Sequence, residues 1–138
     1  MNNKFFVGGI IGGVAAFLMG YLIYGLALAS MMAENAMPGI NKPMADYNWP
    51  FLILGNLALG FLLSYVLSKS GTGGFGGGAS MGAVVGFLTA LSFDSVVFAT
   101  GNVSTMKGMF IDIIGFTIMC AIVGGIVGAY LGMGKAKT

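Results

Sequence analysis

Four long apolar runs, separated by short polar or glycine-rich segments, constrain the fold of this chain more than any other feature. They cover residues 5–30, 50–68, 79–100 and 108–132. Each run is close to or above the roughly 20 residues that a helix needs to cross a bilayer. The runs are continuous and lack the residue-by-residue alternation of a membrane β-barrel strand. The sequence therefore predicts an all-α polytopic membrane protein, a bundle of four transmembrane helices with glycine-rich helix packing.

The composition supports a membrane location and a single domain. Of the 138 residues, 57% are hydrophobic and 7% are charged, which is too little charge for the surface of a water-soluble domain. No polar stretch is long enough to fold separately, so we expect one membrane domain over residues 1–138, with the lipid bilayer as its main partner. The lysines are scattered singly, so no nucleic-acid partner is expected.

The lysines also predict an orientation. Positive charges gather on the cytoplasmic side of membrane proteins. If the N-terminus is cytoplasmic, four lysines lie inside and two lie outside, namely Lys4, Lys69, Lys135 and Lys137 against Lys42 and Lys107. We therefore expect both termini in the cytoplasm.

The connecting segments carry signals of their own. Pro50 suits the first turn of the second helix, and the aromatic pair Tyr47 and Trp49 is typical of anchors at the membrane interface. The segment "SKSGTGGFGGG", residues 68–78, predicts a flexible glycine turn before the third helix.

Small residues recur at every fourth position of the helices. Along the third run, for example, this row starts at Gly78, just before the run, and continues with Gly82, Gly86 and Ala90. Helices in lipid associate through such small residues, because they allow the backbones to approach closely. We expect seven glycines to pack helix against helix: Gly12, Gly20, Gly60, Gly82, Gly86, Gly124 and Gly128.

Each row of small residues ends in one larger or polar side chain. Given a rise of about 1.5 Å per residue, all four fall at a similar depth below the outer surface. They predict a polar intramembrane cluster of Tyr24, Asn56, Asp94 and Asp112, which Tyr21 and Lys107 are near enough to join. Two interpretations stay open: the cluster links the helices by hydrogen bonds, or it binds a proton, a cation or a small molecule.

The side chains that most often perform catalysis are scarce here. The chain has no histidine and one cysteine, Cys120, which falls in an apolar run. Zinc, haem and catalytic-triad chemistry therefore have few candidate residues. We expect no metal site, no cofactor and no enzymatic activity, although acids, tyrosines and serines remain for an intramembrane enzyme as a weaker alternative.

Three stretches together resemble a known family. They are "GVAAFLMGYLIYG" in the first run, "GAVVGFLTAL" in the third and "MKGMFIDIIGFTIMCAIVGGIVGAYLG" in the fourth. The chain resembles a family of small bacterial four-helix membrane proteins that is known only as a domain of unknown function. The resemblance implies a multi-pass protein of the bacterial inner membrane and assigns no active site.

Two functions follow from these patterns. The first is a non-enzymatic subunit, either a homo-oligomer or an accessory part of a larger membrane complex, since small-residue rows occur on all four helices. The second is a small proton- or cation-coupled transporter or channel component that uses Asp94 and Asp112.

Overall fold

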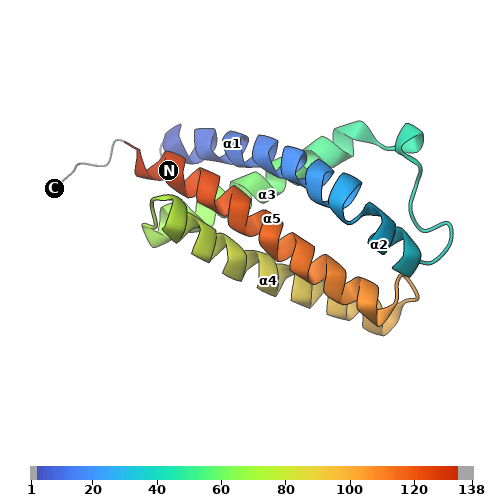
Figure 1. Ribbon diagram of the computed structural model, residues 1–138. Helices are drawn as coiled ribbons and strands as arrows, with labels where there is room; N and C mark the ends of the chain where they lie inside the picture. The colour runs from blue at the N-terminus through green and yellow to red at the C-terminus, as the bar shows by residue number, and fades with distance from the viewer. Residues whose placement is uncertain (1–2, 134–138) are drawn as a thin grey trace.

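The chain folds into helices joined by short loops (Figure 1). The structure, a computed structural model, describes residues 3–133. No strand occurs in this part of the chain, where an isolated β-bridge pairs Ala36 with Ser104. The all-α prediction is confirmed. In chain order the segments are α1 (Asn3–Gly20), the π-helix η1 (Tyr21–Ala27), α2 (Ala29–Asn35), the 3₁₀ turn η2 (Met44–Asp46), α3 (Trp49–Ser70), α4 (Phe75–Thr100) and α5 (Met106–Gly132).

Four helical segments are long and apolar enough to cross a membrane, and the protein is an integral membrane protein. Their mean hydropathies lie between 1.8 and 2.3. Pro50 falls in the first turn of α3, as predicted, and the side chain of Asn48 caps that helix by accepting from the amide of Phe51 at 3.3 Å. The four candidate spans are Asn3–Ala27, Trp49–Ser70, Phe75–Thr100 and Met106–Gly132.

The first apolar run does not continue as one helix to residue 30. After α1 the chain forms the π-helix η1, and the amide of Leu28 donates to the carbonyl of Ile23, five residues back, at 2.7 Å. At Leu28 the backbone leaves the helix, with φ −106° and ψ 4°, and α2 follows. The prediction that the first helix ends at residue 30 is wrong. Hydropathy does not reveal a helix break when the residues on both sides of the break are equally apolar.

The glycine turn between the second and third spans is shorter than predicted. Residues 71–74 form the turn, where Gly71 and Gly74 adopt positive φ of 70° and 86°. The amide of Gly74 donates to the carbonyl of Gly128 at 2.8 Å, which ties the turn to α5. Helix α4 therefore begins at Phe75 rather than at residue 79, because its glycine-rich first turn already lies against α5.

Small residues bring α4 and α5 into close contact. The buried residues of α4 are Gly78, Gly82, Gly86 and Ala90, which form one row along the helix. On the facing helix, a Cβ added to Gly124 would lie 2.9 Å from the Cα of Gly82. Larger residues at these positions would push the two backbones apart.

A second close pair joins α1 and α3. A Cβ added to Gly12 would lie 2.9 Å from the Cα of Gly60. Near the start of α1, the hydroxyl of the fully buried Ser64 donates to the carbonyl of Phe5 at 2.8 Å. The polar group of Ser64 is therefore satisfied inside the protein.

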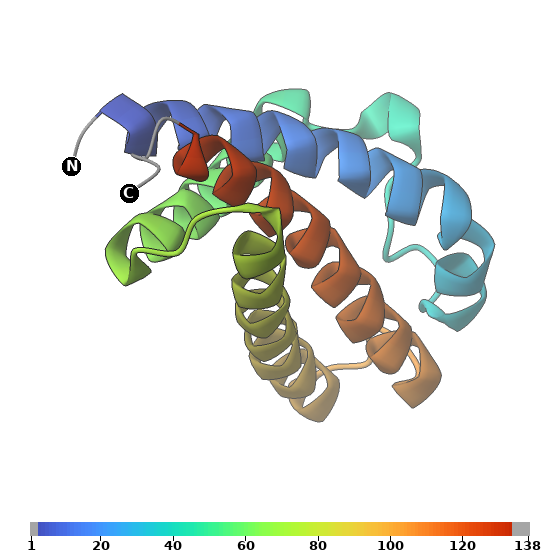
Figure 2. The ribbon, with the colours of Figure 1, turned by 60° about the vertical axis from the view of Figure 1, so that its left-hand side comes forward.

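Helix α5 connects the two pairs. Val123 and Val127 of α5 are fully buried in a core that also contains Ala16 of α1 and Leu63 and Leu67 of α3. Within residues 3–133, α4 makes no close approach to α1, and Figure 2 shows α4 diverging from α1 on the far side of α5. The four spans form an open bundle with α5 at its centre.

The ends of the described chain and the longer loops lie at opposite ends of the bundle (Figure 1). The ammonium group of Lys4 donates to the carbonyl of Met133, which places the start of α1 beside the end of α5. At the other end, Asn35 holds the α4–α5 loop: its carbonyl accepts from the amide of Thr105 at 2.9 Å, and its side-chain oxygen accepts from the Thr105 hydroxyl at 2.7 Å.

Candidate functional site

Two pockets lie in the half of the bundle away from the ends of the described chain. The smaller, about 160 Å³, lies between α4, α5 and the loop that follows α2, with Asp94 in its lining. The larger, about 520 Å³, lies between η1, α3 and α5, with Tyr24 and Asn56 in its lining. Asp112 of α5 lines both pockets. It is therefore the residue that the linings of the two pockets share.

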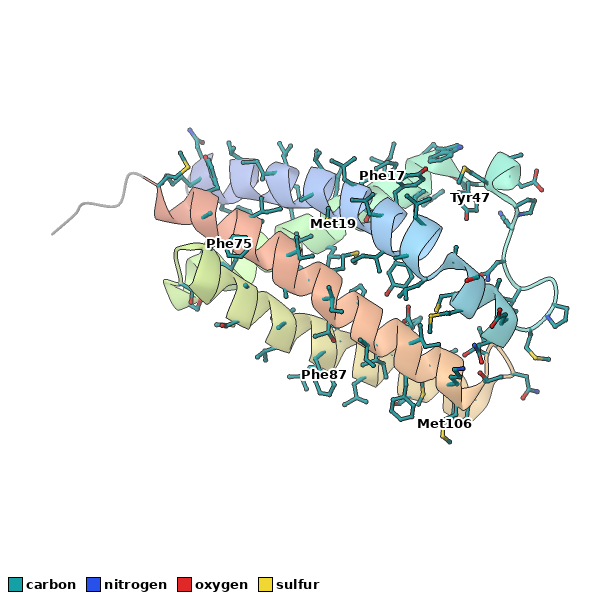
Figure 3. All side chains as sticks on the ribbon, in the orientation of Figure 1. Phe17, Met19, Tyr47, Phe75, Phe87 and Met106 are labelled. Carbon is teal, nitrogen blue, oxygen red and sulfur yellow. The ribbon has the colours of Figure 1, made fainter. Side chains whose placement is uncertain are left out.

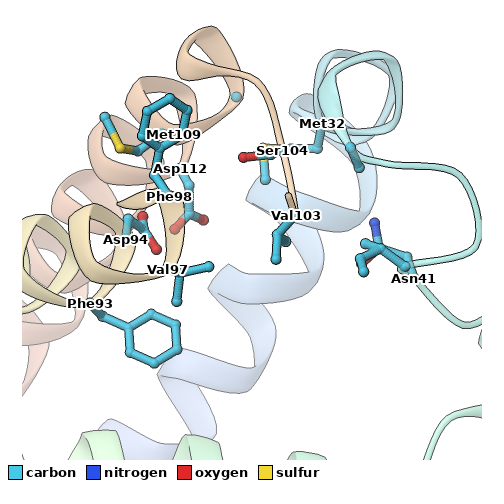
Figure 4. A pocket seen from close by; sticks show the side chains of 13 residues that line it. Met32, Asn41, Phe93, Asp94, Val97, Phe98, Val103, Ser104, Met109 and Asp112 are labelled. Atoms are coloured by element: carbon cyan, nitrogen blue, oxygen red, sulfur yellow. The ribbon is translucent and has the colours of Figure 1, made fainter. Parts of the chain in front are cut away.

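The two aspartates face each other. Figure 4 shows the carboxyl groups of Asp94 and Asp112 pointing toward one another in the smaller pocket. The Oδ2 atom of Asp94 is buried, and no hydrogen-bond donor in residues 3–133 reaches it. A buried carboxylate oxygen without a donor is uncommon, because desolvation costs free energy that a hydrogen bond normally offsets.

The π-helix places Tyr24 against α5. Its hydroxyl donates to the backbone carbonyl of Asp112 at 3.2 Å. Gly115, one turn along α5, leaves room for this approach, since a Cβ there would lie 3.5 Å from the Tyr24 hydroxyl and 2.8 Å from Cδ1 of Leu28. A larger residue at position 115 would therefore require the Leu28 side chain to shift.

Asn56, the residue of the predicted cluster on α3, does not bond to another helix. The side-chain amide of Asn56 donates to the carbonyl of Leu52 on its own helix at 2.8 Å. Its side-chain oxygen remains available as an acceptor at the wall of the larger pocket. Within the described residues, the predicted cluster therefore contributes one interhelical hydrogen bond, from Tyr24 to α5.

Aromatic rings form much of the wall of the larger pocket. Trp49 lies 5.8 Å from the ring of Tyr47 and 6.4 Å from that of Phe17, centroid to centroid. Figure 3 shows Phe17 and Tyr47 at the same end of the molecule, on α1 and on the loop before α3. Tyr21, Tyr24 and Phe116 complete this aromatic wall. The sequence indicated Tyr47 and Trp49 only as interfacial anchors and did not indicate Phe17 or Phe116.

Two predicted residues lie elsewhere than expected. Lys107 is exposed near the start of α5 and lines neither pocket, because at the first turn of the helix its long side chain reaches the surface. Gly20 lies at the wall of the larger pocket, where an added Cβ would meet its nearest neighbour, Met119, only at 3.9 Å. The other predicted packing glycines all stand where an added Cβ would be crowded by a facing helix: Gly12, Gly60, Gly82, Gly86, Gly124 and Gly128.

The side chains that line the two pockets suit a proton, a small cation or an organic ligand better than a transition metal. Residues 3–133 contain no group of three or more His, Cys, Asp or Glu side chains that could hold a metal ion. Cys120 is buried in the α4–α5 contact, apart from both pockets. What the site offers is a pair of carboxyl groups, an amide, phenol hydroxyls and aromatic faces.

Comparisons with family models, with curated proteins and with solved structures found no match to this chain. The function must therefore be argued from the geometry of the two pockets.

Proposed function

We propose that this chain is a non-enzymatic component of a small proton- or cation-coupled transporter or channel, in which Asp94 and Asp112 hold the ion. The observation that carries the proposal is the position of Asp112, which faces Asp94 across the smaller pocket and also lines the larger one. Asp112 is thereby shared by the linings of two neighbouring pockets.

The electrostatics of the pair support an ion between them. A charged side chain within the bilayer costs several kcal/mol unless it is paired or solvated, and two facing carboxylates also repel each other. Lys107 is exposed and lines neither pocket, so it does not supply the missing positive charge there. A proton or a small cation held between the two carboxyl groups removes both costs.

The neutral polar residues support binding rather than structural linkage. If the cluster only joined helices, Asn56 would be expected to bond across to another helix, yet its amide bonds to Leu52 on α3. Asn56 lines the space beside Asp112, and so does Tyr24, whose hydroxyl also bonds to the Asp112 carbonyl. They are suitable as neutral ligands for a substrate on its way to or from the acid pair.

We further propose that the protein spans the bacterial inner membrane with both termini in the cytoplasm, so that the two pockets lie in its outer half. The charge bias of the lysines and the family resemblance support this orientation. In the described part, Lys4 and Lys69 lie toward one end of the bundle and Lys42 and Lys107 toward the other. Lys135 and Lys137 lie outside the described residues.

The test is ion flux into liposomes that contain the purified protein. We expect a proton or alkali-cation gradient to drive flux above that of empty liposomes, and Asp94→Asn and Asp112→Asn each to reduce it roughly ten-fold or more, because each removes one charge of the pair. Asp46→Asn is the matched control, since it removes an exposed acid from the loop before α3 and should leave the flux unchanged.

Full flux in both pocket variants would remove the proposal, and so would wild-type liposomes that are no more permeable than empty ones. Because asparagine has nearly the shape of aspartate, the thermal unfolding of each variant should stay close to that of the wild type. This measurement separates loss of the ion site from loss of the fold.

A second candidate function, a subunit of an oligomer or of a larger membrane complex, is favoured by the one-sided packing of α4. Only one row of α4 is buried, and apolar side chains such as Phe87 and Phe93 are 44% and 67% exposed. Lipid or another protein could cover this surface. Gentle solubilisation followed by native mass measurement distinguishes them: a strict monomer without a stoichiometric companion contradicts the subunit function.

A further inference from the structure

The larger pocket combines aromatic walls with a single charged side chain. Six of its lining residues are aromatic: Phe17, Tyr21, Tyr24, Tyr47, Trp49 and Phe116. Of the described residues that line it, Asp112 alone is charged. The pocket is therefore apolar over most of its surface and negative at one point.

These features select for a particular chemistry. Aromatic faces attract cations through the negative face of the ring, and a carboxylate adds a direct electrostatic attraction. A volume of about 520 Å³ is within the range of about 300–1,000 Å³ that is typical of sites for drug-sized molecules. A bare inorganic ion would leave most of this space unfilled, and a neutral acyl chain would leave the acid without a partner.

We infer that the larger pocket binds a bulky lipophilic organic cation, such as a quaternary ammonium or phosphonium compound, with its charge beside Asp112 and its apolar groups against the aromatic wall. This inference rests on the proposed function and names the substrate class of the same site. Because Asp112 also faces Asp94, an organic cation in the larger pocket competes with the coupling ion for one carboxyl group. Such competition is what an exchange between the two ligands requires.

The protein contains its own reporter for this binding. Trp49 is the one tryptophan of the chain, and it lines the pocket beside Tyr47. Its fluorescence should change when a ligand enters. The probe is tetraphenylphosphonium, a permanent cation, and its control is tetraphenylborate, an anion of closely similar shape.

We expect tetraphenylphosphonium to change the Trp49 emission of the purified full chain in detergent in a saturable manner. Asp112→Asn should raise the apparent Kd about ten-fold, which corresponds to about 1.4 kcal/mol, whereas the control Asp46→Asn should leave it unchanged. Tetraphenylborate should neither saturate nor displace the cation. Equal binding of both probes, or no saturable signal, would overturn the inference.

A second pair of variants guards against misfolding of Asp112→Asn. Tyr21→Leu removes an aromatic face from the pocket wall but keeps an apolar side chain, and should weaken tetraphenylphosphonium binding by about two- to five-fold. Tyr65→Leu makes the same change at an exposed position on α3 outside the pocket and should have no effect. An equal effect of the two variants would contradict an aromatic binding wall.

The two proposals can fail separately. Ion flux that survives Asp94→Asn and Asp112→Asn, together with tetraphenylphosphonium binding that depends on Asp112, would remove the coupling function and keep the organic-cation site. Flux that requires both acids, with no saturable tetraphenylphosphonium binding, would keep the transporter and overturn the substrate class.

Discussion

Individual glycines of α4 have opposite physical roles, and the difference lies in what surrounds them. A Cβ at Gly82 would overlap the backbone carbonyl of Cys120, whereas a Cβ at Gly76, near the start of the same helix, would meet nothing within 4 Å. Gly82 therefore permits the α4–α5 contact. Gly76 only lowers the intrinsic stability of the helix, since glycine is a poor helix former.

This contrast predicts opposite effects of the same substitution. Gly82→Ala should destabilise the protein by about 1–3 kcal/mol, because the obstructing atom is backbone and the two helices must separate. Gly76→Ala should be neutral or stabilise by up to about 1 kcal/mol. Thermal unfolding of the two variants in the same detergent measures the difference, and equal melting temperatures would contradict the close packing of α4 on α5.

The residues of the site were predictable where they continue a packing row. Asp112, Tyr24 and Asn56 each follow a row of small residues along a helix, and the structure places all three at the wall of one pocket. Phe17 could not be recognised in the same way, and Phe116 lies in the same row as Asp112 without any signal that it faces a pocket. An aromatic residue in an apolar run has the same hydropathy signal whether it faces lipid or a cavity, so only the arrangement of the helices distinguishes them.

At the scale of the elements, four spans were predictable from length and hydropathy, but the π-helix was not. Hydrogen bonds in a π-helix span five residues rather than the four of an α-helix. The sequence is mostly apolar both before and within η1, so hydropathy does not mark the point where the π-helix begins. What accompanies it is a tertiary contact, the packing of Leu28 and Tyr24 over Gly115. The periodicity of the sequence cannot predict that contact, because it joins residues far apart in the chain.

The loop after α2 is an element whose position depends on a few hydrogen bonds. It borders both pockets, with Ile40 and Asn41 at the smaller and Met44 and Tyr47 at the larger. At its start, the amide of Met37 donates to the carbonyl of Val103 at 2.9 Å. The loop is therefore held to the α4–α5 connection and encloses the site from that end.

Asn35→Ala should loosen this attachment. The substitution removes the side-chain bond to Thr105, which is worth about 1 kcal/mol, and the amides of Met37 and Thr105 should exchange with deuterium about five-fold faster. Asn102→Ala is the control, because Asn102 is exposed in the same α4–α5 loop. Equal exchange rates in the two variants would show that the Asn35 side chain does not hold the loop.

For the whole molecule, the central position of α5 links packing to function. Its C-terminal half packs through small residues and valines against three other helices, while its N-terminal half carries Asp112, which lines both pockets. The helices are held closely together at one end and diverge at the other (Figure 2). The two pockets lie toward the end at which the helices diverge.

The orientation of the whole molecule decides which side of the membrane the pockets face. The variants Lys42→Cys and Lys69→Cys test the orientation, because residue 42 lies before α3 (Trp49–Ser70) and residue 69 lies at its end. With the N-terminus in the cytoplasm, a membrane-impermeant maleimide should label Lys42→Cys in intact cells and Lys69→Cys only after the membrane is opened. The native Cys120 is fully buried, so the wild type should remain unlabelled in both states. Labelling of both variants from the same side would contradict a membrane-spanning α3, whereas the reverse pattern would keep the four spans and place the pockets toward the cytoplasm.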